Sequence, residues 1–376
     1  MLRNFEVLAF NNRIFNFGAG PATLPLSVMQ EVESEFLNYQ SSGMSIVEMS
    51  HRNPLFEEII STARSRAKKL LGLGQDYELL FLQGGARHQF AMVPTNFGNH
   101  DRVIDVIDSG VWTKFAHQEI SRLKLMPHLV ASTESTKYQS LPKYRPEDLD
   151  PKASYIHFCS NNTVVGTQWK EFLKLKGVRS VVDMSSDIFS RVLDFAQFDL
   201  IYAGAQKNIG PAGTTLVAIK KDWVDQGRKD IPEIFQYSAH IKHDSMYNTP
   251  CCFSIYVCGL VLKWIEDRGG LAGLESENTR KAKLLYSYLD QSSFYRSAVH
   301  LPDRSIMNVV FRIGDGHEAL ESKFVSEAEA AGYSGLKGHR LVGGLRASIY
   351  NAQSYEAVKS LTEFMDNFYE RHKLEL

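Results

Sequence analysis

The sequence has no long apolar segment and no recognisable export signal. Its longest apolar stretch, residues 251–265, is interrupted by Ser254, Gly259 and Lys263. It is shorter than the roughly 20 residues of a membrane-spanning helix, so we interpret it as a buried helix and expect no membrane association. Residues 1–16 lack the basic region, apolar core and cleavage site of a secretory signal. We therefore expect a cytoplasmic protein.

Cysteine is scarce, and neither sign of charge is in excess. The four cysteines do not form the paired spacing of a zinc site, so we expect reduced thiols and no bound metal. Lysine and arginine total 42 against 43 aspartates and glutamates, which gives a net charge of −1. This balance provides no general attraction to nucleic acid. The length of 376 residues suggests about two or three domains.

Short β-branched runs alternate with helical patterns through much of the chain. The expected strands are residues 78–82, 102–107, 155–159, 179–184, 200–204 and 214–219, and the helical patterns include residues 55–71 and 88–97. Several of these strands are apolar almost throughout, as strands covered on both faces must be. The alternation predicts an α/β domain with a largely parallel sheet.

The pattern changes at Gly269-Gly270, which we interpret as a junction between domains. Beyond it we expect helices at residues 271–289, 318–331 and 355–372 and strands at residues 307–313 and 346–350. These elements predict a smaller α+β unit. We assign residues 16–267 to a large domain, and residues 1–15 together with 268–376 to a small domain.

Ligands of open α/β sheets bind outside the carboxyl ends of the strands, so the residues at those ends are the first candidates for a site. The first expected strand is followed by Gly84, Gly85, Ala86 and Arg87, where a helix opens. Small residues and a helix N-terminus suit a phosphate, although a tight turn that serves only packing would look the same. The spacing G-x-G-x-x-G is absent, so the turn is not a dinucleotide-binding motif.

Two charged residues follow other apolar strands. Asp183 comes directly after one of them, and a buried carboxylate needs a cation or hydrogen-bond donors; a helix N-cap is the alternative. Lys207 lies in an apolar, glycine-rich loop after the strand at residues 200–204. Burial favours the neutral amine that forms a Schiff base, whereas a surface lysine would have no such role.

A phosphate cradle, an acidic partner and a Schiff-base lysine are together what pyridoxal 5′-phosphate (PLP) requires. The carboxylate would keep the pyridine nitrogen protonated. The lysine would hold the aldehyde and later move a proton between the substrate Cα and C4′ of the cofactor. The strand ends therefore predict PLP as the cofactor.

Five blocks of the sequence carry a resemblance to a known family. They are NFGAGPA at 16–22, MSHR at 49–52, YAGAQKNIGPAG at 202–213, YNTP at 247–250, and KGHR at 337–340 with GGLRASIYNA at 343–352. By these blocks the chain resembles the phosphoserine aminotransferases, class V members of the fold-type I PLP enzymes, along essentially its whole length. The resemblance implies an α/β fold-type I PLP transferase, with a large domain built on a mostly parallel sheet and a smaller α+β domain.

The resemblance implies how the cofactor ring is held. Lys207 forms the Schiff base, and Asp183 pairs with the pyridinium nitrogen. Trp112 stacks on the ring, and Thr163 bonds the ring hydroxyl. From the residues alone, Trp112 could equally be a core aromatic and Thr163 an ordinary loop residue.

The resemblance also implies how the cofactor phosphate is held. Ala86 and Arg87 give backbone donors, with Gln206 nearby. Asn248 and Thr249 reach the cofactor phosphate of a partner subunit, so the site requires a homodimer. Thr249 is followed by proline, a pattern that also predicts a helix N-cap at Thr249.

Substrate binding requires cations, because the substrates carry a phosphate and carboxylates. The resemblance assigns Arg346 to the α-carboxylate and places His339 and Arg340 at the distal phosphate or γ-carboxylate. His51 and Arg52 have the same role and come from the neighbouring subunit. Each of these residues, taken singly, could be an ordinary surface residue.

The activity implied by the resemblance is reversible transamination of 3-phosphooxypyruvate with L-glutamate, giving O-phospho-L-serine and 2-oxoglutarate in serine biosynthesis. 4-Phosphooxy-L-threonine, in pyridoxine biosynthesis, is a further implied substrate. The alternatives are another class V aminotransferase, such as a serine–glyoxylate type, and a non-catalytic PLP-binding protein. A desulfurase would need a cysteine on a loop near the small domain, and none follows Cys258.

Some positions depart from the usual pattern of this family. Val192 stands where proline is frequent, Gln353-Ser354 replaces a frequent Met-Pro, and Cys251-Cys252 follows Pro250. None of these changes removes a proposed catalytic group. They affect the expected shape of local loops more than the chemistry.

Overall fold

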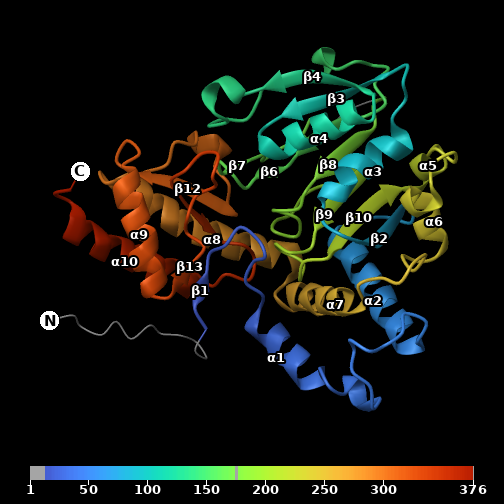
Figure 1. Cartoon of the computed structure of the whole chain (residues 1–376), viewed down its shortest axis with the longest axis horizontal. Coiled ribbons are helices and arrows are strands. Elements are labelled where there is room, and N and C mark those ends of the chain that lie inside the picture. Colours follow the sequence, from blue (N-terminus) through green and yellow to red (C-terminus); the bar gives the residue numbers. More distant parts are fainter. Residues whose placement is uncertain (1–12, 174–176, 376) are drawn as a thin grey trace.

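A seven-stranded sheet forms the centre of the computed structural model, which describes residues 13–173 and 177–375 (Figure 1). In spatial order its strands are β2 (Tyr77–Gln83), β10 (Thr214–Lys220), β9 (Leu200–Gly204), β8 (Ser180–Asp183), β5 (Ile156–Cys159), β3 (Val103–Asp108) and β4 (Met126–Ser132). Of the strands described in this sheet, only β10 runs against its neighbours. The predicted α/β fold with a mostly parallel sheet is therefore confirmed.

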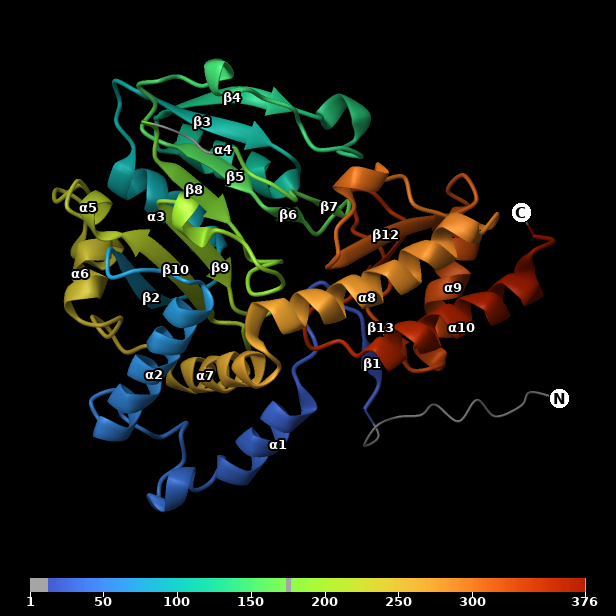
Figure 2. The ribbon, with the colours of Figure 1, turned by 180° about the vertical axis from the view of Figure 1, so that it is seen from behind.

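Helices cover both faces of this sheet. They are α1 (Leu26–Glu35), α2 (Pro54–Leu70), α3 (Arg87–Phe97), α4 (Val111–Arg122), α5 (Lys221–Val224), α6 (Tyr237–Lys242) and α7 (Cys252–Asp267). Helices α2 and α7 share one core with Phe81 and Val182, whereas α3 and α4 share another with Leu80 and Val181. Adjacent residues of β2 and β8 thus face opposite cores, as the pleat requires. Helices α3 and α4 lie in front of the strands in Figure 1 and behind them in Figure 2.

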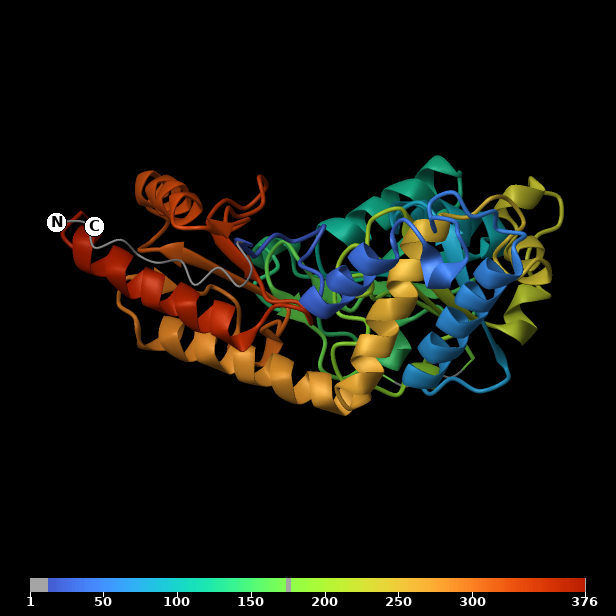
Figure 3. The same cartoon turned by 90° about the horizontal axis from the view of Figure 1, so that it is seen from below.

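The C-terminal part of the chain builds a second, smaller layer structure. Its elements are α8 (Gly270–Gln291), β11 (Tyr295–Arg296), β12 (Asn308–Ile313), α9 (Glu318–Ala330), β13 (Tyr333–Ser334), β14 (Leu345–Ser348) and α10 (Tyr355–His372). Strands β11, β12 and β14 form an antiparallel sheet, and β1 (Phe15–Asn16) pairs with β13. Phe17, Leu285, Phe311 and Phe364 belong to its own core. Figure 3 shows α8 leading from α7 into this part.

The predicted domain boundary falls at the turn between α7, which ends at Asp267, and α8, which begins at Gly270. The division into domains stays a prediction. Residues 1–12, which we assigned to the small domain, lie outside the described residues. No helix in the described part of the chain is long and apolar enough to cross a membrane.

Two local expectations were wrong or incomplete. Strand β4 was not expected, because its half-exposed edge position and Pro127 leave no apolar run. Thr249 is not a helix N-cap: α7 begins at Cys252 with Cys251 as its N-cap residue. The physical reason is that Gln83, at the end of β2, holds this segment by donating to the Thr249 carbonyl and accepting from the Asn248 amide at 2.6 Å.

Candidate active site

The carboxyl ends of β2, β8 and β9 lie at one edge of the large sheet, because these strands run in the same direction. The turn at Gly84-Gly85 follows β2, Asp183 ends β8, and Lys207 lies just beyond β9. In the strand register Asp183 is paired with Tyr202 of β9. The fold thus brings a carboxylate, an amine and a helix N-terminus to the same edge.

Asp183 is a buried carboxylate with one free oxygen. The residue is only 5% exposed. Its Oδ1 accepts from the backbone N–H of Ser185 at 2.8 Å and from the Ser185 hydroxyl at 2.6 Å. Oδ2 has no hydrogen-bond partner among the described residues. Burial raises the pKa of Asp183, while the Lys207 cation and the bonds from Ser185 oppose this shift. A cationic N–H donor placed at Oδ2 would restore the ionised form.

Ser185 was missed in the sequence. Its hydroxyl also accepts from the backbone N–H of Gly204 at 3.1 Å, so it links the ends of β8 and β9. The spacing Asp183-x-Ser185 was the available signal, because an aspartate often bonds the backbone two residues on.

Lys207 is partly buried beside an aromatic ring. Its Nζ lies 5.4 Å from the centroid of the Trp112 ring. Burial lowers the pKa of Lys207, and the Asp183 carboxylate opposes that shift. The loop at Gly20 packs against it: Gly20 has φ +132°, and a Cβ there would lie 3.4 Å from Cγ of Lys207. Lys207 is therefore held in a setting that favours the free amine.

A chain of hydrogen bonds connects the aromatic ring to a half-buried arginine. The indole N–H of Trp112 donates to the Thr163 hydroxyl at 2.9 Å, and Nη1 of Arg346 donates to the Thr163 carbonyl at 2.8 Å. The Nε–H of Arg346 is buried without a partner in the described part of the chain. Arg346 therefore keeps a free donor for an anion beside Trp112 and Lys207.

The start of α3 supplies further donors. Ala86 is its N-cap residue and Arg87 its first residue, and their backbone N–H groups find no acceptor within the described residues. The Arg87 guanidinium lies 4.2 Å from the Phe115 ring centroid and 6.0 Å from that of Trp112. The backbone carbonyl of Gln206, next to Lys207, accepts from the backbone N–H of Ala22 in the Gly20 loop. The free N–H groups of Ala86 and Arg87 are consistent with a phosphate site, which stays a prediction.

Other predicted substrate residues are brought together only in part. Burial lowers the pKa of His339, and the positive charges of Arg346 and Arg340 lower it further. These three residues therefore lie within electrostatic range of one another. His51 and Arg52 lie in the turn before α2, and no contact between them and Lys207 or Arg346 occurs in the described parts. Asn248 and Thr249 contact Gln83 of the same chain.

A cavity of about 570 Å³ is lined by residues that flank predicted site residues in the chain, but by none of those site residues themselves. It is lined by Val111, Asn162 and Val164, the chain neighbours of Trp112 and Thr163, and by Val342 and Gly343 of the loop that carries His339 and Arg340.

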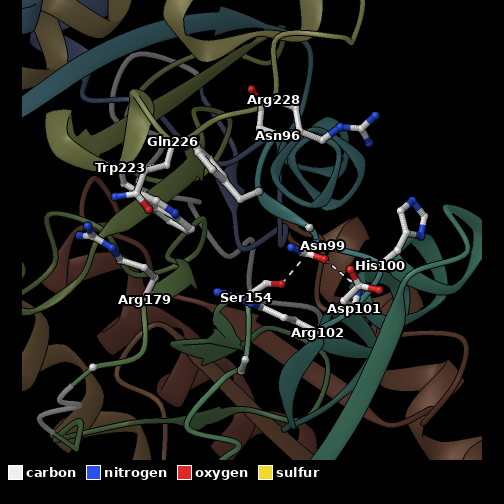
Figure 4. Close-up of a pocket in the computed structure, with 14 residues that line it drawn as sticks. Asn96, Asn99, His100, Asp101, Arg102, Ser154, Arg179, Trp223, Gln226 and Arg228 are labelled. Carbon is white, nitrogen blue, oxygen red and sulfur yellow. Dashed lines mark hydrogen bonds between the residues drawn. The ribbon is translucent and has the colours of Figure 1, made fainter.

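A second cavity, of about 620 Å³, lies at the opposite edge of the large sheet, where β3, β5 and β8 begin (Figure 4). Its cations are largely neutralised: Arg179 pairs with Asp199 and Asp222, and Arg228 pairs with Asp230. No predicted site residue lines this cavity. We therefore do not assign the chemistry to it.

The residues at the carboxyl edge fit PLP. Asp183 offers a free oxygen for a pyridinium N–H, and Trp112 presents a flat ring beside Lys207 Nζ. The free N–H groups of Ala86 and Arg87 suit a phosphate. This set supplies each kind of contact that the cofactor needs.

Comparisons with known proteins agree with this geometry. A phosphoserine aminotransferase of Desulfosudis oleivorans is 48% identical over 95% of this chain and 98% of its own length. The solved structure of the phosphoserine aminotransferase from Bacillus circulans subsp. alkalophilus has a TM-score of 0.92 and 46% identity, covering 96% of this chain and 99% of that one. A PLP-bound phosphoserine aminotransferase from Trichomonas vaginalis has a TM-score of 0.86 and 34% identity over 94% of this chain and 100% of that one. The family model "Aminotransferase class-V" matches residues 14–361. The chain belongs to the class-V aminotransferase family.

Proposed function

We propose that the chain catalyses reversible transamination of 3-phosphooxypyruvate with L-glutamate, giving O-phospho-L-serine and 2-oxoglutarate, with PLP as its cofactor. The relatives named above are phosphoserine aminotransferases, and one of them is PLP-bound. The observation that carries the proposal is the placement of Lys207 beside Asp183 and Trp112 at the carboxyl edge of the sheet.

PLP, when bound, supplies an aldehyde that condenses with amines and a ring that withdraws electrons from the substrate. Lys207 is the amine placed to bind that aldehyde and to move a proton at the substrate Cα. Its lowered pKa supports the second role, because the uncharged amine accepts the proton. Oδ2 of Asp183 holds the protonated ring nitrogen, and Trp112 and Thr163 orient the ring.

The cations divide between two anionic groups of the substrate. Arg346, anchored on the Thr163 carbonyl, binds the α-carboxylate through its guanidinium group. His339 and Arg340 bind the distal phosphate or γ-carboxylate. His51 and Arg52 of a neighbouring subunit complete this second pocket. The same pocket would also admit 4-phosphooxy-L-threonine, because one extra carbon is weakly discriminated.

A homodimer would complete the site. Two large apolar residues that precede His51 and Arg52 in the chain are exposed in the single chain, Leu37 at 81% and Val47 at 53%. Exposed apolar surface is typical of contact surfaces, which supports coverage by a second copy. In that dimer Asn248 and Thr249 would reach the partner's cofactor phosphate. We further propose that the protein works in the cytoplasm and divides at residues 267–268 into the two domains described above.

The substrate assignment is tested by comparing O-phospho-L-serine with L-serine as amino donors to 2-oxoglutarate. We expect kcat/KM to favour phosphoserine by at least about 1,000-fold, because a site built to bind a phosphate loses those bonds with a substrate that lacks it. Arg340→Gln should lower the preference for phosphoserine over serine. Lys337→Gln, which removes a positive charge from the same loop, should leave this preference unchanged. A preference for serine would instead identify a serine–glyoxylate type of enzyme. PLP binding with no glutamate formed from either donor would identify a non-catalytic protein.

A further inference from the structure

Lys281 is a buried amine in the middle of α8, and burial lowers its pKa to about 7. The residue is 2% exposed, and its Nζ donates to four backbone carbonyls: Ile349 at 3.1 Å, Tyr350 at 2.7 Å, Asn351 at 3.4 Å and Gln353 at 2.8 Å. A buried ammonium is costly unless it is hydrogen-bonded, and three hydrogens shared among these carbonyls satisfy it.

Lys281 lacks a carboxylate partner in the described part of the chain. Glu277, whose charge acts on Lys281, is itself paired with Arg268 at 2.8 Å. The Lys281 amine is therefore directed at the carbonyls of residues 349–353, which we call the 349–353 segment. These four acceptors favour the protonated form of the amine, whose charge-assisted hydrogen bonds are stronger than neutral ones and fix the path of this segment.

The 349–353 segment touches two parts of the active site. Its Tyr350 hydroxyl donates to the Ala19 carbonyl at 2.9 Å, in the loop that packs on Lys207. Its Asn351 backbone N–H donates to Oδ1 of Asn208 at 3.1 Å, and Asn208 directly follows Lys207. At its other side the segment continues β14, which carries Arg346.

Side-chain amides reinforce the same segment. Asn278, one turn before Lys281 on α8, donates to Oδ1 of Asn351 at 2.8 Å, and Asn351 donates to the Phe189 carbonyl at 3.0 Å. The segment is thus tied to α8 on one side and to the loops of the large sheet on the other. A shift of its backbone would move Arg346 relative to Lys207.

We propose that Lys281 is a positioning residue, which holds the 349–353 segment so that Arg346 and Asn208 stay in register with Lys207. The inference rests on the proposed function in one respect, because the roles of Arg346 and Lys207 come from that function. Lys281 itself touches neither substrate nor cofactor, and it acts through the backbone of the segment.

The test compares Lys281→Met with Lys283→Met in the PLP-loaded protein. Lys283 is an exposed residue of the same helix, so its variant removes the same charge without affecting the segment. We expect KM for phosphoserine to rise about tenfold or more in Lys281→Met, because small misplacements of binding groups are costly, and to stay unchanged in Lys283→Met. A role in stability alone would lower the active fraction, and hence kcat, without moving KM.

A second readout requires no turnover. The midpoint of the pH titration of visible absorbance in the PLP-loaded protein should shift in Lys281→Met, because Asn208 adjoins Lys207. If the parent protein loads PLP but shows no transamination, the proposed function fails while this readout still tests Lys281. An unchanged KM and an unchanged midpoint would overturn the role of Lys281.

A further variant is needed if Lys281→Met does not fold. Lys281→Gln keeps a polar end at this position but cannot donate to all four carbonyls at once. The proposal then expects KM to rise in the same direction. A folded Lys281→Gln protein with the KM and the titration midpoint of the parent would overturn the proposal by itself.

Discussion

At the scale of single residues, burial sets the protonation of the side chains around β8 and β9. It raises the pKa of Asp183 and lowers that of Lys207, and each residue opposes the shift of the other. These opposing effects arise because the Asp183 carboxylate and the Lys207 ammonium carry opposite charges and lie close together, at the end of β8 and just beyond β9. The site is therefore prepared for a ligand that brings a cationic N–H to Asp183 and an aldehyde to Lys207.

His157 shows the same effect of burial without a charged partner. It lies in β5, is 4% exposed, and its Nε2 is 2.8 Å from the Tyr202 hydroxyl. Burial lowers its pKa from 6.5 to about 4. The folded protein therefore binds this proton less readily than the unfolded chain does.

Stability should accordingly fall as the pH is lowered from about 6.5 toward 4, the range in which the unfolded chain gains a proton on His157 and the folded one does not. The difference corresponds to roughly 3 kcal/mol at the acid end, from about 1.4 kcal/mol per pKa unit. His157→Gln should flatten this pH dependence in urea unfolding at fixed cofactor content. A variant with the same slope as the parent would show that His157 does not titrate as described.

At the scale of elements, a buried carboxylate fixes the start of the helix that carries Trp112. Asp108, the last residue of β3, accepts from the Thr113 hydroxyl at 2.9 Å and from the backbone of Gly110 at 3.2 Å. Its other oxygen accepts from Ser132 at 2.7 Å and Tyr138 at 2.8 Å. The first turn of α4 is thereby joined to the end of β4.

Thr113→Val tests this connection between α4 and β4 through Asp108, because valine keeps the shape of threonine and removes the hydroxyl. We expect a loss of about 1 kcal/mol in the free energy of unfolding, as for a lost helix cap, together with weaker PLP binding through Trp112. Ser121→Ala, in the last turn of α4, removes an exposed hydroxyl bond and serves as the control. Equal urea midpoints and PLP affinities for the two variants would contradict the role of Asp108 and Thr113.

The sequence predicted elements where local pattern determines structure. Strands β8 and β9 are short apolar runs bounded by polar or glycine residues, so their positions could be predicted to within one residue. Thr249 was misassigned because Gln83, far along the chain, holds its carbonyl. Lys281 could not be found for the same reason: its carbonyl acceptors lie 68 to 72 positions away. Contacts between distant segments leave no periodic signal in a single sequence.

At the scale of the whole molecule, the proposed homodimer divides each site between two chains. Lys207 and Asp183 would belong to one subunit, whereas His51 and Arg52 would come from the other. In a twofold dimer each chain gives one set and receives the other. A single chain, in which His51 and Arg52 make no contact with Lys207, would then be incomplete.

Mixing two inactive variants tests this division. Lys207→Ala and Arg52→Ala chains, each inactive alone, should recover activity after unfolding and joint refolding at equal amounts. Half of the dimers are then mixed, and one of the two sites in each is intact, so about a quarter of the parental activity should return. The absence of any recovery, with mixed dimers demonstrated, would place Arg52 and Lys207 of one site in the same chain.

The central claim is that the amine of Lys207 binds the PLP aldehyde and exchanges it with the substrate amine. The most direct measurement is the visible absorbance of the PLP-loaded protein before and after addition of O-phospho-L-serine, without 2-oxoglutarate. We predict that the absorbance band of the bound cofactor disappears within a single turnover and returns when 2-oxoglutarate is added, and that Lys207→Ala lacks the original band. A parent spectrum that phosphoserine leaves unchanged, or a Lys207→Ala protein with the parental band, would contradict the account.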